Sequence, residues 1–213
     1  MKLTVLGYGA GGHAGVIVDI LEDNKKYKII GLIDKSNKKS AHGLKIIGND
    51  TKLKYFCDKK SKNIFFGLAG IKNIKKNILL YEKLEKAGFN IIDVIHTTSI
   101  ISKKAKIGKG VKIFAGVKVN SNAKIGKNVF LNTACIIEHD CQIDDHSQIG
   151  PGAYLSGGVK VGRGSFVGIG VRVNEKIKIA NNCLIGAGSV VTKNTAKDTI
   201  YAGVPAKQIG IIK

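Results

Sequence analysis

Every sixth residue from Ile101 to Val191 is isoleucine, valine or leucine. Four residues after each of them stands alanine, valine, cysteine, serine or threonine, with Ile177 as the larger exception. A six-residue period fits neither an amphipathic helix nor alternating hairpin strands. It predicts a solenoid with three short faces per coil, in which the long aliphatic side chains fill the axis and the small ones pack beside them. Successive coils would then lie roughly 4.8 Å apart.

Glycine and cysteine occupy regular places in this repeat. Glycine often follows the inward aliphatic directly, at positions 108, 126, 150, 162, 168 and 186. We expect these glycines to form the corners of the coil, where a positive φ costs glycine little. Cys135, Cys141 and Cys183 fall at the small inward position, where cysteine packs as a small apolar residue. The chain has no CxxC spacing, which favours a reduced, cytoplasmic setting.

The region before the repeat has the pattern of an α/β domain. The stretch "KLTVLGYGAGGHAGVIVDILED" predicts a strand, a glycine turn and a helix, and Gly7, Gly9 and Gly12 satisfy GxGxxG. A second strand, "KIIGLID", ends in Asp34, which completes a dinucleotide-binding pattern. A strand at "NIFFGLA", a lysine-rich helix near 73–88 and a strand at "NIIDVIH" follow. We predict a Rossmann-like domain over 1–95 and a solenoid domain over 96–213.

Composition narrows the classes of partner. The chain has 35 basic and 15 acidic residues, a net charge of +20 that favours phosphorylated or otherwise acidic ligands. The lysines are scattered and no aromatic-rich basic strip accompanies them, so we expect no nucleic-acid partner. The opening run "LTVLGYGA" is far shorter than the ~20 apolar residues of a spanning helix, so no membrane insertion is expected either.

The segment "IIEHDCQIDDHSQIG", residues 136–150, concentrates the chemistry-bearing side chains. His139 comes two residues after the inward Ile137, at a predicted corner, and histidine titrates near neutral pH as a general base must. Gly157 lies one coil further on, so its N–H is open to a developing oxyanion beside the imidazole. Cys141 points inward and no tetrahedral ligand set remains, so we predict no metal site. His42 and His96 are expected to be loop and linker residues, and His146 to be exposed or to lie in an interface. The acids Glu138, Asp144 and Asp145 are expected to be solvated or to cap loops.

The repeat and the chain end "IGAGSVVTKNTAKDTIYAGVPAKQIG" resemble the hexapeptide-repeat acyltransferases, in which "GAGSVVTK" and "GVPAK" are typical of the acetyl-CoA-binding tail. The resemblance implies a left-handed parallel β-helix and a homotrimer with active sites between neighbouring subunits. The two-part arrangement is similar to the nucleotide-sugar N-acetyltransferases of the bacillosamine and perosamine types and to the sialic acid O-acetyltransferases. In that subgroup "GAGGH" and "ID" hold the nucleotide of the acceptor rather than a redox cofactor.

The resemblance also implies roles for individual residues. His139 matches the catalytic histidine and Asp140 the acid that orients it, while Gly157 matches a backbone donor to the acetyl carbonyl. Relatives often carry a second histidine where this chain has Gln148, whose amide can donate a hydrogen bond to the coenzyme but cannot shuttle a proton. The remaining matches are Gly12 and His13 for the phosphates or base, Asp34 and Lys35 for the nucleoside, Asn132 for the acceptor sugar, and Ile169 and Ala187 for the pantetheine arm.

The function expected from these features is acetyl transfer from acetyl-CoA to the amine of a nucleotide-linked 4-amino-4,6-dideoxy sugar in bacterial glycan biosynthesis. O-acetylation of sialic acid is the alternative within the same family. The glycine pattern also leaves open a NAD-dependent sugar oxidoreductase, and the repeat a solenoid scaffold without catalysis. The sequence leaves open the nucleotide base, the stereochemistry of the sugar and the pathway.

Overall fold

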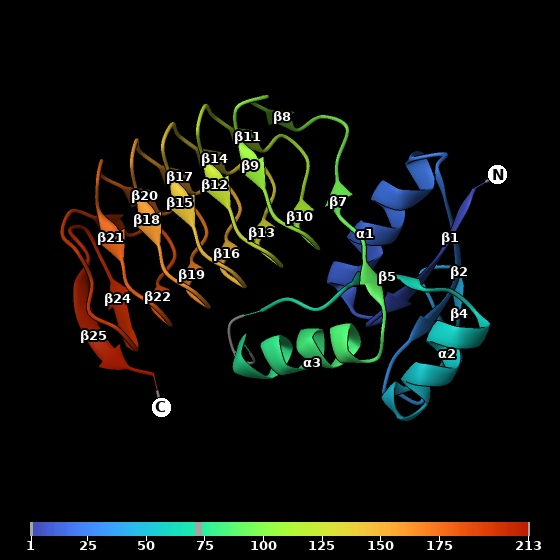
Figure 1. Ribbon diagram of the computed structural model, residues 1–213. Coiled ribbons are helices and arrows are strands. Elements are labelled where there is room, and N and C mark those ends of the chain that lie inside the picture. The colour runs from blue at the N-terminus through green and yellow to red at the C-terminus, as the bar shows by residue number, and fades with distance from the viewer. Residues whose placement is uncertain (1, 71–73, 213) are drawn as a thin grey trace. The chain divides into compact units, whose positions relative to one another are not determined.

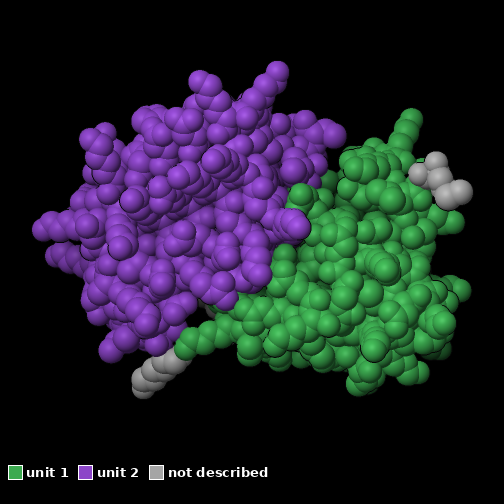
Figure 2. Space-filling view, viewed as in Figure 1, with its two compact units in different colours: residues 1–94 green, residues 95–213 purple. Residues whose placement is uncertain are grey.

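The computed structural model describes residues 2–70 and 74–212, and the chain divides into two compact units after Val94 (Figure 2). The first unit is an α/β domain and the second is built from stacked parallel strands, so the predicted mixed fold is confirmed. Within the described residues, no helix is both long and apolar enough to cross a bilayer.

The first unit contains one six-stranded sheet, with the strand order β3-β4-β2-β1-β5-β6. β1 lies between β2 and β5 and is parallel to both, whereas the short β3 is antiparallel to β4. The strands are β1 (Leu3–Tyr8), β2 (Tyr27–Ile33), β3 (Ser40–Ala41), β4 (Leu44–Gly48), β5 (Asn63–Phe66) and β6 (Asn90–Ile91). The helices are α1 (Gly12–Asp23), the 3₁₀ turn η1 (Asp50–Lys52), α2 (Leu53–Lys59) and α3 (Ile74–Lys86).

The predicted elements of this unit are present, with two additions. The helix expected near 73–88 is α3, and Asn73 lies outside the described residues. The antiparallel pair β3–β4 and the helix α2 were not predicted, because β3 has only two residues and α2 only seven, too few for a clear periodicity. Gly9 has a φ of +104°, and a Cβ there would lie 2.8 Å from Leu68 Cδ2, so the turn after β1 requires glycine.

The second unit is a solenoid of two-residue strands that form three parallel sheets (Figure 1). From β8 to β20, each strand pairs with the strand eighteen residues further on, as Lys118 does with Ile136 and Val119 with Ile137, whereas β22 pairs with β24 sixteen residues further on. The first sheet contains β7 (Val94–Ile95), β10 (Lys112–Ile113), β13 (Phe130–Leu131), β16 (Gln148–Ile149), β19 (Phe166–Val167) and β22 (Leu184–Ile185), and it ends with β24 (Thr199–Ala202) and the antiparallel β25 (Lys207–Ile211). The second sheet contains β8 (Ile100–Ile101), β11 (Lys118–Val119), β14 (Ile136–Ile137), β17 (Tyr154–Leu155), β20 (Arg172–Val173) and β23 (Val190–Val191). The third contains β9 (Lys106–Ile107), β12 (Lys124–Ile125), β15 (Gln142–Ile143), β18 (Lys160–Val161) and β21 (Lys178–Ile179).

From β10 to β23, the second residue of each strand points into the solenoid and the first points out. The inward aliphatics from Ile113 to Val191 are almost fully buried and form one continuous core with Cys135, Cys141 and Cys183. The packing predicted for these three cysteines is therefore confirmed. Burial raises the pKa of the Cys135 thiol to about 12 and of the Cys141 thiol to about 11, which keeps both protonated and unreactive.

The glycines that follow the inward aliphatics directly were expected to have positive φ values, and this expectation is wrong. Positive φ values fall two residues later, at Gly152, Gly158 and Gly170 and also at Asn122 and Asp140. The glycines directly after the aliphatics are required by close approach of the next coil. A Cβ at position 108, 150 or 168 would lie 2.6–2.7 Å from backbone atoms of the following coil. The corner is therefore shaped by stacking as well as by backbone dihedrals.

Lys112 is a buried cation on the outer side of β10, and we predict that it makes the stability of the protein depend on pH. Its side chain is almost fully buried, and its Nζ donates a hydrogen bond to Asn128 Oδ1 at 2.8 Å. Burial lowers the pKa of Lys112 from 10.5 to about 7. Between these two values the unfolded chain holds a proton that the folded chain has released, so the free energy of unfolding rises with pH, by at most ~1.4 kcal/mol per pH unit. Below about pH 7, Lys112 is protonated in both the folded and the unfolded state, so its contribution to the free energy of unfolding no longer changes with pH.

The variant Lys112→Met removes this rise. We expect the thermal midpoint of the variant to exceed that of the wild type by the largest amount near pH 7. This difference should shrink as the pH approaches 10. Lys118→Met is the control, since Lys118 holds the same outward strand position but is exposed. The prediction fails if the two variants shift with pH in parallel.

Candidate active site

The corner after β14 places His139 and Asp140 side by side on the surface of the solenoid. Asp140 has a φ of 60°, a conformation that aspartate and asparagine tolerate better than most residues. Its backbone N–H donates to Ser121 O in the preceding coil at 3.0 Å, which fixes the turn. The two side chains are 64% and 58% exposed, so both are accessible to ligands.

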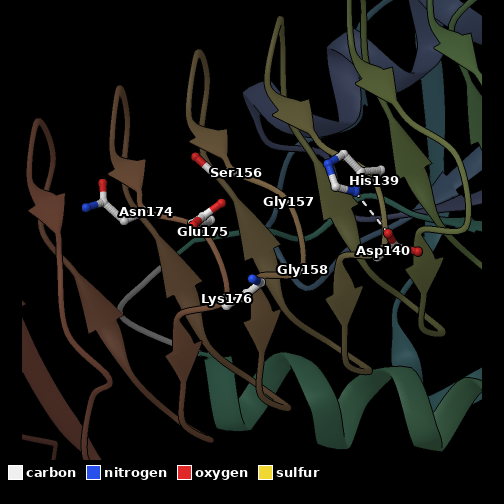
Figure 3. A pocket seen from close by; sticks show the side chains of 8 residues that line it. All are labelled: His139, Asp140, Ser156, Gly157, Gly158, Asn174, Glu175 and Lys176. Atoms are coloured by element: carbon white, nitrogen blue, oxygen red, sulfur yellow. Dashed lines mark hydrogen bonds and ion pairs between the residues drawn. The ribbon is translucent and has the colours of Figure 1, made fainter.

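A hydrogen bond joins the two side chains. His139 Nδ1 lies 2.9 Å from Asp140 Oδ2, and the two groups point toward each other (Figure 3). Because a carboxylate only accepts, this contact places the proton of a neutral imidazole on Nδ1 and leaves Nε2 as an acceptor. The pKa of Asp140 lies below its ordinary value, because the carboxylate accepts hydrogen bonds from the side chains of His139 and Asn122 and lies beside the imidazole charge. The carboxylate therefore stays ionised and holds the ring.

Gly157, one coil further on, lies directly against the imidazole. A Cβ at this position would be 2.6 Å from Cε1 and 2.7 Å from Nε2 of His139. The neighbouring Gly158 N–H donates to His139 O at 2.9 Å, which ties the two coils together at this corner. Among the residues that the structure describes, no acceptor takes the Gly157 N–H. The corner thus presents a base and a free backbone donor on adjacent coils.

A cavity of about 470 Å³ opens in front of this pair (Figure 3). It extends toward later coils, and its lining includes residues that were not predicted: Ser156, Gly158, Asn174, Glu175 and Lys176. The signal for them was present, since Asn174 and Glu175 follow Ser156 and Gly157 by the eighteen-residue coil. Within the described chain, no group of three or more histidine, cysteine or acidic side chains is placed to hold a metal ion.

A second cavity, of about 350 Å³, lies in the first unit at the carboxyl ends of β1 and β2. Strand order reverses at β1, and ligands of open α/β sheets bind at such a point. Asp34 and Lys35 both line the cavity, as do Tyr8 and Asn77. Asp34 Oδ2 accepts from Ala10 N at 2.9 Å, and Oδ1 accepts from Ser36 N at 2.7 Å.

The electrostatics of this cavity favour a polar ligand. Burial raises the pKa of Asp34, but hydrogen bonds from Ser36 and Ala10 and the charge of Lys35 outweigh it, so that the pKa lies below its ordinary value. Burial, with added effects from Asp50 and Asp34, raises the pKa of Tyr8 to about 12, which keeps its hydroxyl a donor. Asn77 is buried, and its Nδ2 has no hydrogen-bond partner among the described residues. Sequence reasoning missed Asn77, because a polar residue in a lysine-rich helix carries no positional signal.

The glycine turn holds two further predicted residues outside this cavity. Gly12 is exposed, with open space where a Cβ would stand, and His13 is half-buried in the first turn of α1. His42 lies in the turn between β3 and β4, as expected of a loop residue, and it also contacts the glycine turn. Its Nε2 lies 3.0 Å from Gly11 O, and a Cβ on Gly15 would meet its ring at 2.7 Å, so His42 packs over the turn.

The remaining predicted residues lie away from His139 within one chain. Ile169 and Ala187 are exposed and occupy the same corner one coil apart, after β19 and β22. Asn132 lies at that corner after β13, and its Oδ1 accepts from Thr133 N at 2.8 Å. Gln148 is buried on the outer side of β16. The structure therefore brings His139, Asp140 and Gly157 together and leaves these four at other faces of the solenoid.

The expectation that His146 lies on the surface or in an interface with other chains is not met in the chain itself. His146 is 2% exposed, and its Nδ1 lies 2.9 Å from Asn128 Nδ2. Asn128 is also the acceptor for Lys112, so the three side chains form a buried polar row across successive coils. Asp145 fits the expected loop-capping role, because its Oδ1 accepts from Lys127 N at 2.8 Å.

Comparison with known proteins gives matches over both units. Residues 4–83 match the family model of the PglD N-terminal domain, and residues 122–157 and 158–193 match the bacterial transferase hexapeptide model. A crystal structure of a variant of perosamine N-acetyltransferase from Caulobacter crescentus, in complex with CoA and GDP-perosamine, is 28% identical with a TM-score of 0.92, and the match covers 97% of each chain.

Two further proteins share the fold over nearly the whole chain. The acetyltransferase domain of PglB from Neisseria gonorrhoeae is 27% identical with a TM-score of 0.90, and the match covers 98% of this chain and 100% of that domain. A second structure of that domain is a complex with acetyl coenzyme A. WeeI from Acinetobacter baumannii, at 23% identity and a TM-score of 0.85, has the same fold.

Proposed function

We propose that this chain, an acetyltransferase built from a PglD N-terminal domain and bacterial transferase hexapeptide repeats, acts on the amine of a nucleotide-linked sugar. The acyl donor is acetyl-CoA, and the acceptor is a 4-amino-4,6-dideoxy sugar of a cytoplasmic bacterial glycan pathway. The observation that carries the proposal is the imidazole of His139, which is hydrogen-bonded to Asp140 at 2.9 Å and packs against the unsubstituted Gly157. The complex of the Caulobacter enzyme with CoA and GDP-perosamine supports both reactants.

Each group at the corner has one task in the transfer. The neutral amine attacks the thioester carbon, and His139 Nε2 takes a proton from the attacking nitrogen. Asp140 holds the ring and stabilises the imidazolium that forms. The negative charge on the carbonyl oxygen is met by the Gly157 N–H. When the tetrahedral intermediate collapses, the carbon–sulfur bond breaks and the imidazolium returns the proton to the thiolate, which leaves as CoA.

The first unit would bind the nucleotide of the acceptor. Asp34 and Lys35 line its cavity at the carboxyl ends of the strands, where a carboxylate held by backbone N–H groups can accept from ribose hydroxyls. Gly12 and His13 are proposed to approach the phosphates or the base from the start of α1, because the open space at Gly12 admits a ligand close to the backbone.

A homotrimer with active sites between subunits completes the proposal. Ile169 and Ala187, proposed for the pantetheine arm, lie at a different corner from His139, as does Asn132, proposed for the sugar. Another copy of the chain can supply that corner to the same coenzyme. Gln148 lies on the outer side of β16 and does not line the cavity that contains His139, so its proposed contact with the coenzyme also depends on another copy of the chain. Light scattering of the intact protein measures the assembly, and a monomeric mass would contradict it.

The proposed reaction is tested by thiol release from acetyl-CoA with a panel of acceptors. We expect release with a 4-amino-4,6-dideoxy sugar linked to UDP, dTDP or GDP, and a product heavier by one acetyl group. The same nucleotide sugars with a 4-hydroxyl group are the control and should be inert. Release with sialic acid alone would favour the O-acetyltransferase. Consumption of NAD without thiol release would favour an oxidoreductase, and no reaction throughout would favour a scaffold.

A further inference from the structure

A third cavity, of about 320 Å³, lies on the other side of Asp140 from the cavity that contains His139 and Gly157. It is lined by a regular array from three successive coils. Lys104, Asn122 and Asp140 occupy the same corner position, and Lys106, Lys124 and Gln142 occupy the same outward strand position in β9, β12 and β15. Asp140 is thus shared by two cavities that extend in opposite directions along the solenoid.

The cavity concentrates positive charge without a protein counter-ion. Lys106 and Lys124 are direct partners on neighbouring parallel strands, so their side chains start roughly 4.8 Å apart. Like charges placed opposite each other destabilise a sheet. Within the described part of the chain, no carboxylate pairs with the amines of Lys104, Lys106 or Lys124, and the Asp140 carboxylate is already engaged by His139 and Asn122. Such an arrangement favours an anionic ligand that bridges the amines.

We propose that Lys104, Lys106 and Lys124 bind the diphosphate of the acceptor substrate, which leaves Gly12 and His13 to approach the base rather than the phosphates. The identity of this ligand rests on the proposed function. In a nucleotide-linked 4-amino sugar, the diphosphate on C1 and the amine on C4 lie across one sugar ring from each other. An amine at His139 therefore places the diphosphate one ring away. The third cavity, called the lysine cavity from here on, begins at Asp140, the neighbour of His139, and offers the positive charge that a diphosphate needs.

Coenzyme A also carries a diphosphate. The positions of the two cavities argue against binding of the coenzyme in the lysine cavity. The thioester oxygen must meet the Gly157 N–H, in the cavity formed by residues 156–158 and 174–176. The lysine cavity is formed by earlier coils, from Lys104 to Gln142. The donor would then occupy the side of later coils and the acceptor the side of earlier coils, with His139 and Asp140 between them.

The test compares two double variants of the intact protein that remove equal charge from the same sheet. Lys106→Gln with Lys124→Gln alters the cavity, whereas Lys160→Gln with Lys178→Gln alters exposed lysines at the same outward position outside it. Glutamine already stands at this position in the sheet as Gln142, and loss of like charges relieves repulsion, so both variants are expected to fold. Thermal midpoints verify this.

Two readouts follow. Titration calorimetry with inorganic pyrophosphate should show affinity reduced roughly tenfold in the cavity variant and nearly unchanged in the control. With substrates, the KM for the nucleotide sugar should rise by about the same factor, while the KM for acetyl-CoA and kcat stay close to wild type.

Three results would overturn the proposal. The first is an equal loss of pyrophosphate affinity in both variants, which would indicate only a general effect of positive charge. The second is a change in the KM for acetyl-CoA instead of the KM for the acceptor. The third is wild-type pyrophosphate affinity in the cavity variant. Lysine-dependent pyrophosphate binding in a protein that acetylates no amino sugar would support the anion site and refute the proposed reaction alone.

Discussion

His139→Ala is expected to lower turnover by about 10²–10⁴-fold, the range in which a general base contributes. The imidazole is the base that lies against Gly157, and alanine leaves nothing to take the proton of the attacking amine. The KM for acetyl-CoA should change little, because the loss concerns the transition state more than coenzyme binding. The fold should be unaffected, since the side chain is 64% exposed.

Initial rates of thiol release at saturating acceptor measure this effect, with thermal midpoints as the check on folding. His96→Ala is the matched control: it removes a histidine of the same unit that lies next to Thr98 and outside the cavity. Near-normal turnover of His139→Ala would contradict the assignment of the base. His139→Asn, which keeps a polar side chain near Asp140 but cannot take the proton, should be as slow as the alanine variant.

Gly157→Ala is expected to lower turnover by roughly 10²-fold through displacement of the imidazole. The new Cβ would stand 2.6 Å from Cε1 of His139, closer than real contacts allow. Because the imidazole is exposed, it can swing away at little cost in stability, but it then loses its hydrogen bond to Asp140 and its position against Gly157. Activity and stability should therefore separate: kcat falls and the thermal midpoint stays within a few degrees of the wild type.

Gly116→Ala is the matched control for this variant. A Cβ at Gly116 would meet Ala134 at an ordinary 3.7 Å, and Ala134 itself holds the same corner position one coil later with a φ of 56°. Alanine can therefore be held at that corner, although a positive φ strains any residue other than glycine, so Gly116→Ala is expected to lose some stability and to keep its kcat, the reverse of Gly157→Ala. Wild-type kcat in Gly157→Ala, or a loss of kcat matched by an equally large loss of stability in both variants, would contradict the mechanism.

The candidate active site was predictable because the repeat has a strict period. Once the inward positions were assigned from Ile101 to Val191, the eighteen-residue coil placed His139 and Gly157 at one corner by counting alone. The same counting assigned Cys141 to the core and removed it from the list of possible ligands. The catalytic roles themselves stay predictions until the variants are measured.

Contacts that depend on side-chain burial could not be predicted from residue positions along the repeat. His146 and Lys112 both hold positions that point away from the solenoid axis, yet both are buried and share Asn128 as a partner. In the first unit, Asn77 comes to line the cavity with Asp34 because α3 packs near the ends of β1 and β2. No local pattern encodes such a meeting between segments some forty residues apart.

The sequence by itself determined the solenoid, its coil length and the identity of its inward residues, because the alternation of long and small apolar side chains has one regular way to fill an axis. It also determined the strand–turn–helix at the start of the chain, where Gly9 is required by its φ of +104°. Only the tertiary structure decided which polar groups meet: the bond between His139 and Asp140, the empty space that Gly157 leaves for the ring, and the lysine cavity beside them. The physical reason is that a period fixes where a backbone stands, whereas rotamers, burial and the approach of neighbouring coils fix where a side chain ends.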